Sequence, residues 1–165
     1  MALERIENLL SIKKGYFFIL LFITLDLISK LMAEQYLEFG QPVPLIPILD
    51  FFLVYNSGIA FSILDINNKM LSFGLSILGL LIVGYLNALY RAQESSIYQV
   101  IFILIISGAM GNIIDRLVDG VVTDFLYLHI GNISFFVFNL ADAFISIGAT
   151  LFLICLLYTS DAADD

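Results

Sequence analysis

The sequence predicts an α-helical integral membrane protein with four transmembrane helices, a small extracellular β-hairpin and both termini in the cytoplasm. The chain of 165 residues is 61% hydrophobic and 13% charged, and its mean hydropathy is +1.00. Soluble domains typically contain about 45–50% apolar and about 25% charged residues. Four apolar runs are each long enough to cross a bilayer, which takes about 20 residues. Lysine and arginine are concentrated in the loops on one side of these runs, which sets the orientation.

The composition also limits what the protein binds. We expect residues 1–157 to form a single four-helix domain, because the chain has no room for a second. The formal net charge is −8, and since the acids cluster on the non-cytoplasmic side, this charge gives no reason to expect a nucleic-acid partner. One cysteine and one histidine exclude an internal disulfide and make a cysteine or histidine metal site improbable.

The first apolar run covers residues 15–32 and follows a basic segment that ends in Lys13 and Lys14. A basic start before an apolar run also describes a secretory signal peptide. This run is long, carries Asp26 and Lys30 in its second half, and is not followed by a small-x-small cleavage site. We therefore predict a retained transmembrane helix.

Residues 33–69 form the longest segment predicted to be non-helical. All the prolines of the chain lie here, at Pro42, Pro44 and Pro47, and proline breaks a helix. Residues 48–61 are rich in aromatic and β-branched side chains, which is typical of a strand.

Two further spans are predicted at residues 70–90 and 97–117, joined by a short polar turn at 91–96. Residues 121–137 predict a β-hairpin, because polarity partly alternates and Gly131-Asn132 supplies a tight turn. The fourth span is predicted at residues 139–157. The basic residues Arg5, Lys13, Lys14 and Arg91 then lie on the cytoplasmic side, and the long loop and the hairpin face outward.

The polar residues of three spans are predicted to lie at one depth. With a rise of about 1.5 Å per residue, Lys30 lies about 22 Å beyond the start of its span, and Asn112 lies about 22 Å beyond the start of the third. Asp142 falls in the first turn of a helix that runs inward. Because the hydrocarbon core is about 30 Å thick, all three approach its outer boundary.

Each polar group has a structural and a functional interpretation. Asp26 and Lys30 have the i, i+4 spacing of a helical ion pair, which either neutralises itself inside the bundle or contacts a substrate. Asn112, Asp115 and Arg116 share a helix face and form either a polar clamp, in which Arg116 needs an acid, or a site for a substrate backbone or lipid head group. Close helix contact is expected just before them, at Gly108, Ala109 and Gly111.

Asp124 and Asp142 are the best candidates for a working pair. Asn139 and Asp142 share a face at the start of the fourth span, where a helix cap is the structural interpretation. Asp124 heads the hairpin and has no such structural explanation. Two aspartates at a water–membrane boundary suit acid–base hydrolysis, in which one is protonated and the other ionised. Acids within membranes also form proton relays.

Two other segments have simpler interpretations. Asn56 and Gly58 favour a tight turn and form either a loop corner or an edge that reads a substrate backbone. His129 is most simply a surface residue of the hairpin. Residues 155–165 read CLLYTSDAADD and resemble translated adapter sequence, so we interpret residues 158–165 as an acidic, non-native tail and assign Cys155 no function.

Five short motifs, taken together and in order, resemble the bacterial lipoprotein signal peptidase (signal peptidase II) family over residues 15 to about 154. They are Asp26-x3-Lys30, Asn56-x-Gly58-x-Ala60-Phe61, Gly108-x2-Gly111-Asn112-x2-Asp115-Arg116, Asp124-Phe125, and Asn139-x-Ala141-Asp142-Ala143. Each motif is weak alone. Their order on a chain with four spans makes the resemblance specific.

The resemblance implies an intramembrane aspartyl endopeptidase of the bacterial inner membrane, with its active site near the outer leaflet. It implies cleavage of a prolipoprotein signal peptide just before the diacylglyceryl-modified cysteine, contact with membrane lipids, inhibition by globomycin, and no metal or cofactor. Asp124 and Asp142 would be the catalytic pair, while substrate or acids would be oriented by Asn56, Gly58, Asn112, Arg116 and Asn139. A small extracellular β-cradle would come from residues 48–61 and 121–137.

Two functions from other classes compete with this interpretation. A small transporter or proton relay predicts polar groups throughout the bilayer depth, whereas the sequence confines them to one outer layer. A non-catalytic scaffold that binds lipid or signal peptide shares every binding feature and differs only in needing no pair of acids.

Overall fold

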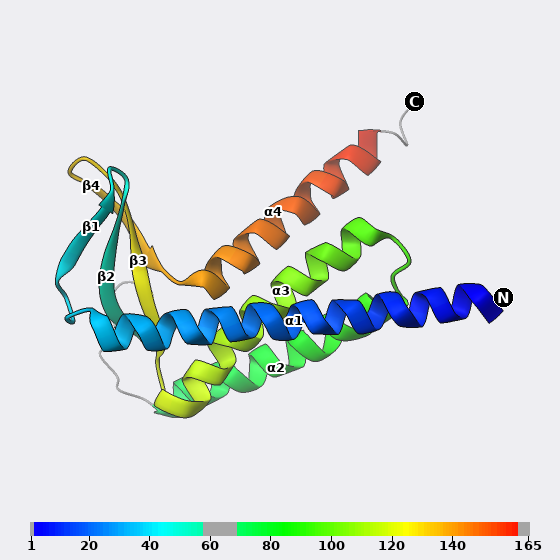
Figure 1. The fold of residues 1–165 in the computed structure, drawn as a ribbon, viewed down its shortest axis with the longest axis horizontal. Coiled ribbons are helices and arrows are strands. Elements are labelled where there is room, and N and C mark those ends of the chain that lie inside the picture. The colour runs from blue at the N-terminus through cyan, green and yellow to red at the C-terminus, as the bar shows by residue number, and fades with distance from the viewer. Residues whose placement is uncertain (1, 58–68, 162–165) are drawn as a thin grey trace.

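The computed structural model describes residues 2–57 and 69–161, which form four long helices and one small sheet (Figure 1). The helices are α1 (Ala2–Tyr36), α2 (Lys69–Ala92), α3 (Ser96–Asp119) and α4 (Leu140–Asp161). Each contains a stretch long and apolar enough to cross a membrane, at Ile12–Tyr36, Ser72–Ala92, Ser96–Asp119 and Leu140–Tyr158. The predicted four membrane-spanning helices with a small antiparallel sheet are confirmed.

The sheet is antiparallel and lies at the end of the bundle where α1 finishes and α4 begins (Figure 1). Its strands are β1 (Pro42–Ile46), β2 (Leu49–Asn56), β3 (Val122–Ile130) and β4 (Ile133–Phe138), in that spatial order. The predicted hairpin is β3–β4, and the turn at Gly131 has a φ of 57°, which favours glycine. The predicted strand at 48–61 is β2, although residues 58–61 lie outside the described part.

The sequence did not predict β1, nor the full length of α1. Pro42 and Pro44 were interpreted only as helix breakers, yet they sit within β1, because a strand at the edge of a sheet tolerates proline. Residues 33–36 were assigned to the loop but are helical. Their polarity marks the membrane boundary and does not itself end a helix. At the other end of the chain, α4 continues through residues 158–161.

Helix α3 is central, because α1, α2 and α4 all pack against it. Half of its apolar window is buried, against 11% for α2 and for α4. Away from the sheet, the buried core gathers around Tyr90 and comprises Ile19, Phe102, Ile103 and Ile106. A smaller cluster of Ala33, Leu53 and Phe125 joins α1 to the sheet.

Close contact of α3 with α4 and with α1 depends on small residues. A Cβ at Gly108 would overlap the carbonyl oxygen of Ala141, and a Cβ at Gly111 would overlap the carboxyl group of Asp26. The predicted close helix contact is therefore confirmed at both glycines. The end of α3 is set by Gly120, whose φ of 80° closes the helix with a hydrogen bond to the Arg116 carbonyl. This turn sends the chain directly into β3.

Replacing Gly108 by alanine should destabilise the protein, because the new Cβ meets backbone that has no space to move. We expect a loss of about 1–3 kcal/mol in the free energy of unfolding, measured by thermal or denaturant unfolding in detergent micelles. Gly84→Ala in α2 is the matched control. A Cβ added at Gly84 would meet nothing within 4 Å, so the higher helix propensity of alanine should leave stability unchanged or slightly raised. Equal effects in the two variants would contradict this account of the α3–α4 contact.

Candidate functional site

A buried lysine connects the helices at the sheet end of the bundle. The Nζ atom of Lys30 lies 2.9 Å from Asp26 Oδ2 and 3.2 Å from Asp115 Oδ2. It also donates a hydrogen bond of 2.9 Å to Asn112 Oδ1. Asp26 is 0% and Lys30 is 2% exposed. These three partners match the three donors of an ammonium group, which favours the structural interpretation of the predicted Asp26–Lys30 pair.

The two acids that bind Lys30 also position the segments that follow. The backbone N–H of Ala141, at the start of α4, donates to Asp26 Oδ1 over 2.8 Å. The backbone N–H of Thr123, in β3, donates to Asp115 Oδ2 over 2.8 Å. The ion cluster therefore fixes the backbone next to each of the two candidate aspartates, Asp124 and Asp142.

Asp142 lies in a capping box at the start of α4. The backbone N–H of Asp142 donates to Asn139 Oδ1 over 3.0 Å, and the backbone N–H of Asn139 donates back to Asp142 Oδ2 over 3.3 Å. Such reciprocal bonds satisfy N–H groups that the first helical turn leaves free. The remaining oxygen, Oδ1, accepts a hydrogen bond of 2.8 Å from Asn112 Nδ2. The predicted structural role as a cap is thus correct, and it leaves one oxygen for the site.

Asp124 receives amide hydrogen bonds on both carboxyl oxygens. Asn139 Nδ2 donates to Oδ1 over 2.6 Å, and Asn56 Nδ2 donates to Oδ2 over 3.0 Å. Asn56 reaches Asp124 diagonally across the β2–β3 ladder, where Val54 lies opposite Asp124 and Asn56 opposite Val122. The two aspartates therefore share Asn139 as a common partner.

The lysine determines which way the bridging amides point. An ammonium group only donates hydrogen bonds, so the atom of Asn112 that faces Lys30 must be its oxygen. The amide nitrogen of Asn112 then faces Asp142. Asn139 Nδ2 donates to the same Asn112 oxygen over 3.2 Å, so its nitrogen also faces Asp124. A buried cation thus presents amide donors to both carboxyl groups.

The pKa of Asp124 is raised from 3.8 to about 6, chiefly by burial and also by the neighbouring charge of Asp142. The hydrogen bonds from Asn56 and Asn139, and the positive charge of Lys30, oppose this rise. Burial is the largest influence because the side chain, 2% exposed, has lost the water that would solvate a negative charge. The carboxyl group therefore keeps its proton to a higher pH than an ordinary aspartic acid does.

The remaining predicted site residues have different positions. Arg116 was expected to pair with an acid, but its neighbour Asp115 pairs with Lys30 instead. Within the described residues the buried Nε atom of Arg116 has no hydrogen-bond partner, while its charge interacts with Asp142 and Asp124 at longer range. Gly58 lies outside the described residues. His129 lies in the hairpin, 3.3 Å from Asp50 Oδ1.

Sequence reasoning missed a contact between Glu34 and Thr123. The Thr123 hydroxyl donates to Glu34 Oε1 over 2.7 Å, which ties the end of α1 to the strand that carries Asp124. A signal was available, because Asp26, Lys30 and Glu34 recur at intervals of four residues and so share one helix face. Among the described residues, no group of histidine, cysteine and acidic side chains could hold a metal ion.

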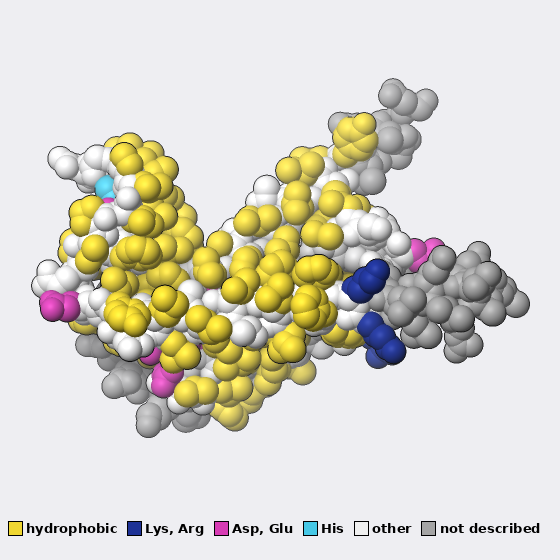
Figure 2. Space-filling model, in the orientation of Figure 1, with side chains coloured by type: hydrophobic (Ala, Val, Ile, Leu, Met, Phe, Trp, Pro, Cys, Tyr) yellow, Lys and Arg dark blue, Asp and Glu magenta, His cyan; other side chains and the backbone are white. Residues whose placement is uncertain are grey.

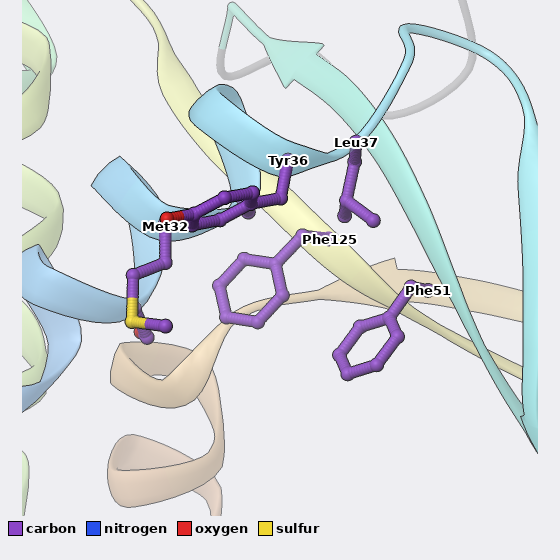
Figure 3. A pocket seen from close by; sticks show the side chains of 7 residues that line it. Met32, Tyr36, Leu37, Phe51 and Phe125 are labelled. Atoms are coloured by element: carbon purple, nitrogen blue, oxygen red, sulfur yellow. The ribbon is translucent and has the colours of Figure 1, made fainter.

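Two apolar hollows flank these polar groups. One, of about 260 Å³, lies between the end of α1 and the sheet, and Phe51 and Phe125 face Met32 and Tyr36 across it (Figure 3). The other, of about 410 Å³, lies between the sheet and the start of α4, and Asp142 is on its wall. Figure 2 shows the surface hollowed between the sheet and α4, with hydrophobic side chains on both sides.

Comparison with known proteins identifies consistent relatives. The family described as signal peptidase (SPase) II matches residues 18–158. The lipoprotein signal peptidase of Coxiella burnetii is 40% identical over 144 residues, 86% of this chain and 88% of that protein. That of Brucella ovis is 38% identical over 146 residues, 87% of this chain and 89% of the relative.

Solved structures agree with the fold. A bacterial membrane enzyme solved by the in meso method at 2.3 Å resolution superposes with a TM-score of 0.75 and 29% identity, covering 90% of each chain. A second, at 1.9 Å resolution, superposes with a TM-score of 0.76 and 28% identity, covering 88% of this chain and 93% of that one.

Replacing Lys30 by methionine should strongly destabilise the fold, because Asp26 and Asp115 would remain buried without a cation. Removing one partner of a buried ion pair typically costs about 3–5 kcal/mol, which unfolding in detergent micelles would measure. Lys14→Met, at an exposed position, is the matched control and should change stability by less than about 0.5 kcal/mol. Similar unfolding curves for the two variants would rule out the lysine as the centre of the network.

The stability of the wild type relative to Asp124→Asn should depend on pH. A carboxyl group whose pKa is about 6 when folded, against 3.8 ordinarily, binds its proton more tightly in the folded state. Its contribution is complete below about pH 4 and is lost as the pH rises through about 6. We expect the wild type to lose up to about 3 kcal/mol relative to the variant across this window. Unfolding at several pH values would measure the difference, and parallel curves would contradict the raised pKa.

Proposed function

The chain belongs to the signal peptidase II family and is an aspartic-type endopeptidase, and on this premise we propose that Asp124 and Asp142 are its catalytic pair. The observation that carries the proposal is Asn139, which bonds to both carboxyl groups, over 2.6 Å and 3.3 Å. The substrate is a prolipoprotein that carries a diacylglyceryl group, cut just before the lipid-modified cysteine. The relatives named as lipoprotein signal peptidases support this assignment.

The two acids have different surroundings, which supports different roles. Asp124 is buried and its pKa is raised to about 6, which favours it as the member of the pair that carries the proton and donates a hydrogen bond to the carbonyl oxygen of the scissile peptide. Asp142 lies on the wall of a hollow, where a water has access, and serves as the base that accepts a proton from the attacking water. Opposite protonation states in one pair are how carboxyl groups perform acid–base hydrolysis.

The reaction proceeds in two balanced steps. The water oxygen bonds to the carbonyl carbon, one water proton passes to Asp142, and the Asp124 proton passes to the carbonyl oxygen, which gives a tetrahedral diol. Asp142 then donates its proton to the amide nitrogen, the C–N bond breaks, and a hydroxyl proton of the diol returns to Asp124. The pair ends as it began, and no metal or cofactor takes part in these steps.

The neighbouring polar residues orient the reacting groups. Asn112 and Asn139 hold the carboxyl groups through their amide nitrogens, and Asn56 holds Asp124 from β2. Arg116 has an unsatisfied Nε within the described residues, which supports a role in binding the substrate. Gly58 is proposed to contribute from the loop after β2. Asp26, Lys30 and Asp115 are structural.

We place this multi-pass protein in the bacterial inner membrane, with both termini in the cytoplasm and the acid pair near the outer leaflet. Figure 2 supports this orientation, since lysine and arginine side chains gather near the N-terminal end on the face shown, away from the sheet. A lipid-anchored cysteine then presents the scissile bond at a fixed depth, and positioning of this kind lowers the barrier. Membrane lipids contact the exposed apolar faces, globomycin occupies the site, and nucleic acid is no partner.

A transporter and a binding scaffold explain fewer of the structural observations than a peptidase does. A transporter or proton relay needs polar groups along the depth of the bundle, whereas the buried acids and Lys30 of the described residues meet at the sheet end. A binding scaffold needs no acid pair, so it gives no reason for the buried carboxyl group of Asp124, which caps no helix. The relatives do not favour either alternative.

Asp124→Asn and Asp142→Asn should each reduce processing of a diacylglyceryl-modified precursor by at least about 100-fold, because each removes one member of the acid–base pair. The rate at which the purified variants cleave the precursor, detected by the change in its mass, would measure this loss. Asp119→Asn is the control, since its side chain is exposed at the end of α3, and it should retain activity. Full cleavage by either catalytic variant, with unfolding showing a folded protein, would remove that residue from the pair.

A further inference from the structure

The two edges of the sheet differ in a way that the proposed function does not explain. The sheet has the order β1-β2-β3-β4, so β1 and β4 are its edge strands. Strand β1 reads PVPLI and carries Pro42 and Pro44. Strand β4 reads ISFFVF, has no proline, and within the described residues pairs only with β3.

This difference determines which edge is able to accept another strand. An edge strand presents unpaired N–H and C=O groups to any extended chain, and proteins commonly block such edges with proline, which has no N–H to donate. Two prolines in five residues block β1. Strand β4 carries no charged or proline residue, so its outer edge is open.

The open edge leads directly to the acid pair. Strand β4 ends at Phe138, Asn139 follows, and α4 begins with Leu140. Phe136, Val137 and Phe138 line the hollow of about 410 Å³ that also contains Asp142. A peptide paired with this edge would therefore lie in that hollow, beside the groups proposed to cleave it.

The substrate has a matching need. A peptide bond inside a helix has its N–H and C=O groups engaged in the helix, so the segment to be cut must be extended for its carbonyl to be reached. In the hydrocarbon core, backbone N–H and C=O groups without partners are costly, so an extended segment that leaves the core gains from new hydrogen-bond partners. The backbone N–H and C=O groups of an extended substrate segment and those of the open edge of β4 are therefore able to hydrogen-bond to one another.

We propose that the segment of the prolipoprotein around the scissile bond adds to β4 as a further, antiparallel strand of the sheet. This inference rests on the proposed function. The direction of the substrate strand relative to β4 follows from the topology. Strand β4 runs from the hairpin turn towards the membrane-spanning α4. A signal peptide runs outward from the membrane to its cleavage site, so the two chains lie in opposite directions.

Strand addition has a consequence for selectivity. Backbone hydrogen bonds supply binding that is independent of side chains, and only alternate substrate side chains face the hollow. The enzyme would thus accept varied sequences around the cut while requiring an unblocked backbone. Phe136 and Phe138, on one face of β4 because side chains alternate, would contact the side chains that face them.

An N-methyl scan of a synthetic diacylglyceryl-modified lipopeptide tests this proposal. Each residue on both sides of the cut, except the scissile amide itself, is N-methylated in turn, and kcat/KM is measured with the wild-type protein. We expect losses of about tenfold or more at every second position and little change between them, because only alternate N–H groups of a strand face its neighbour. Losses that follow no two-residue alternation, or none at all, would overturn strand addition.

The unmethylated lipopeptide separates the two claims. Its cleavage tests the proposed function by itself, so a substrate that is cut normally but shows no alternation defeats only strand addition. Cross-linking then tests the direction, using cysteines placed along β4 of Asp142→Asn in a Cys155→Ala background and a substrate with a movable thiol. An antiparallel pair predicts that moving the thiol towards the substrate C-terminus shifts the cross-link to lower residue numbers in β4. A shift to higher numbers would overturn the antiparallel assignment.

Discussion

The contact between the Lys30 ammonium group and its three partners is the interaction on which the rest of the structure depends. Lys30 pairs with Asp26 in its own helix, α1, and joins α1 to α3 through Asp115 and Asn112. Both of its acids also accept hydrogen bonds from backbone N–H groups of other segments, so the cluster holds the starts of β3 and α4 in place. A buried charge of this kind contributes little net stability when fully paired, but it is costly to leave unpaired. The network therefore favours the arrangement in which Lys30, Asp26 and Asp115 all keep their partners.

The network around Lys30 also orients the amide groups that face Asp124 and Asp142. Asn112 and Asn139 present nitrogen atoms to the two aspartates because the lysine occupies the acceptor side of the first amide. Burial alone would keep both acids neutral, and exposure alone would keep both ionised. Their placement is unequal, with Asp124 inside and Asp142 on a hollow, so the two carboxyl groups have different surroundings. The sheet adds an edge strand without proline, β4, whose residues line the same hollow as Asp142.

Much of the fold was predictable because the relevant signals are local. Four apolar runs, the turn at Gly131 and the i, i+4 spacing of Asp26 and Lys30 each depend on neighbouring residues, and each prediction was confirmed. Strand β1 was missed because its pairing is non-local, and the prolines that argued against structure are tolerated only at an edge. The partner of Asp115 was also unpredictable, since the choice between Arg116 and Lys30 depends on how two helices pack.

The capping box that begins α4 places two evolutionary demands on the same atoms. Asn139 and Asp142 start a membrane helix and also belong to the proposed reaction centre. A substitution at either position would thus impair two properties, the formation of the helix and the proposed catalysis. A descendant that had lost its enzymatic purpose would still retain both residues for as long as it needed the helix. Finding both residues in a distant homologue is therefore weak evidence that the homologue is an active enzyme. Asp124 caps no helix, so its presence is the more informative marker.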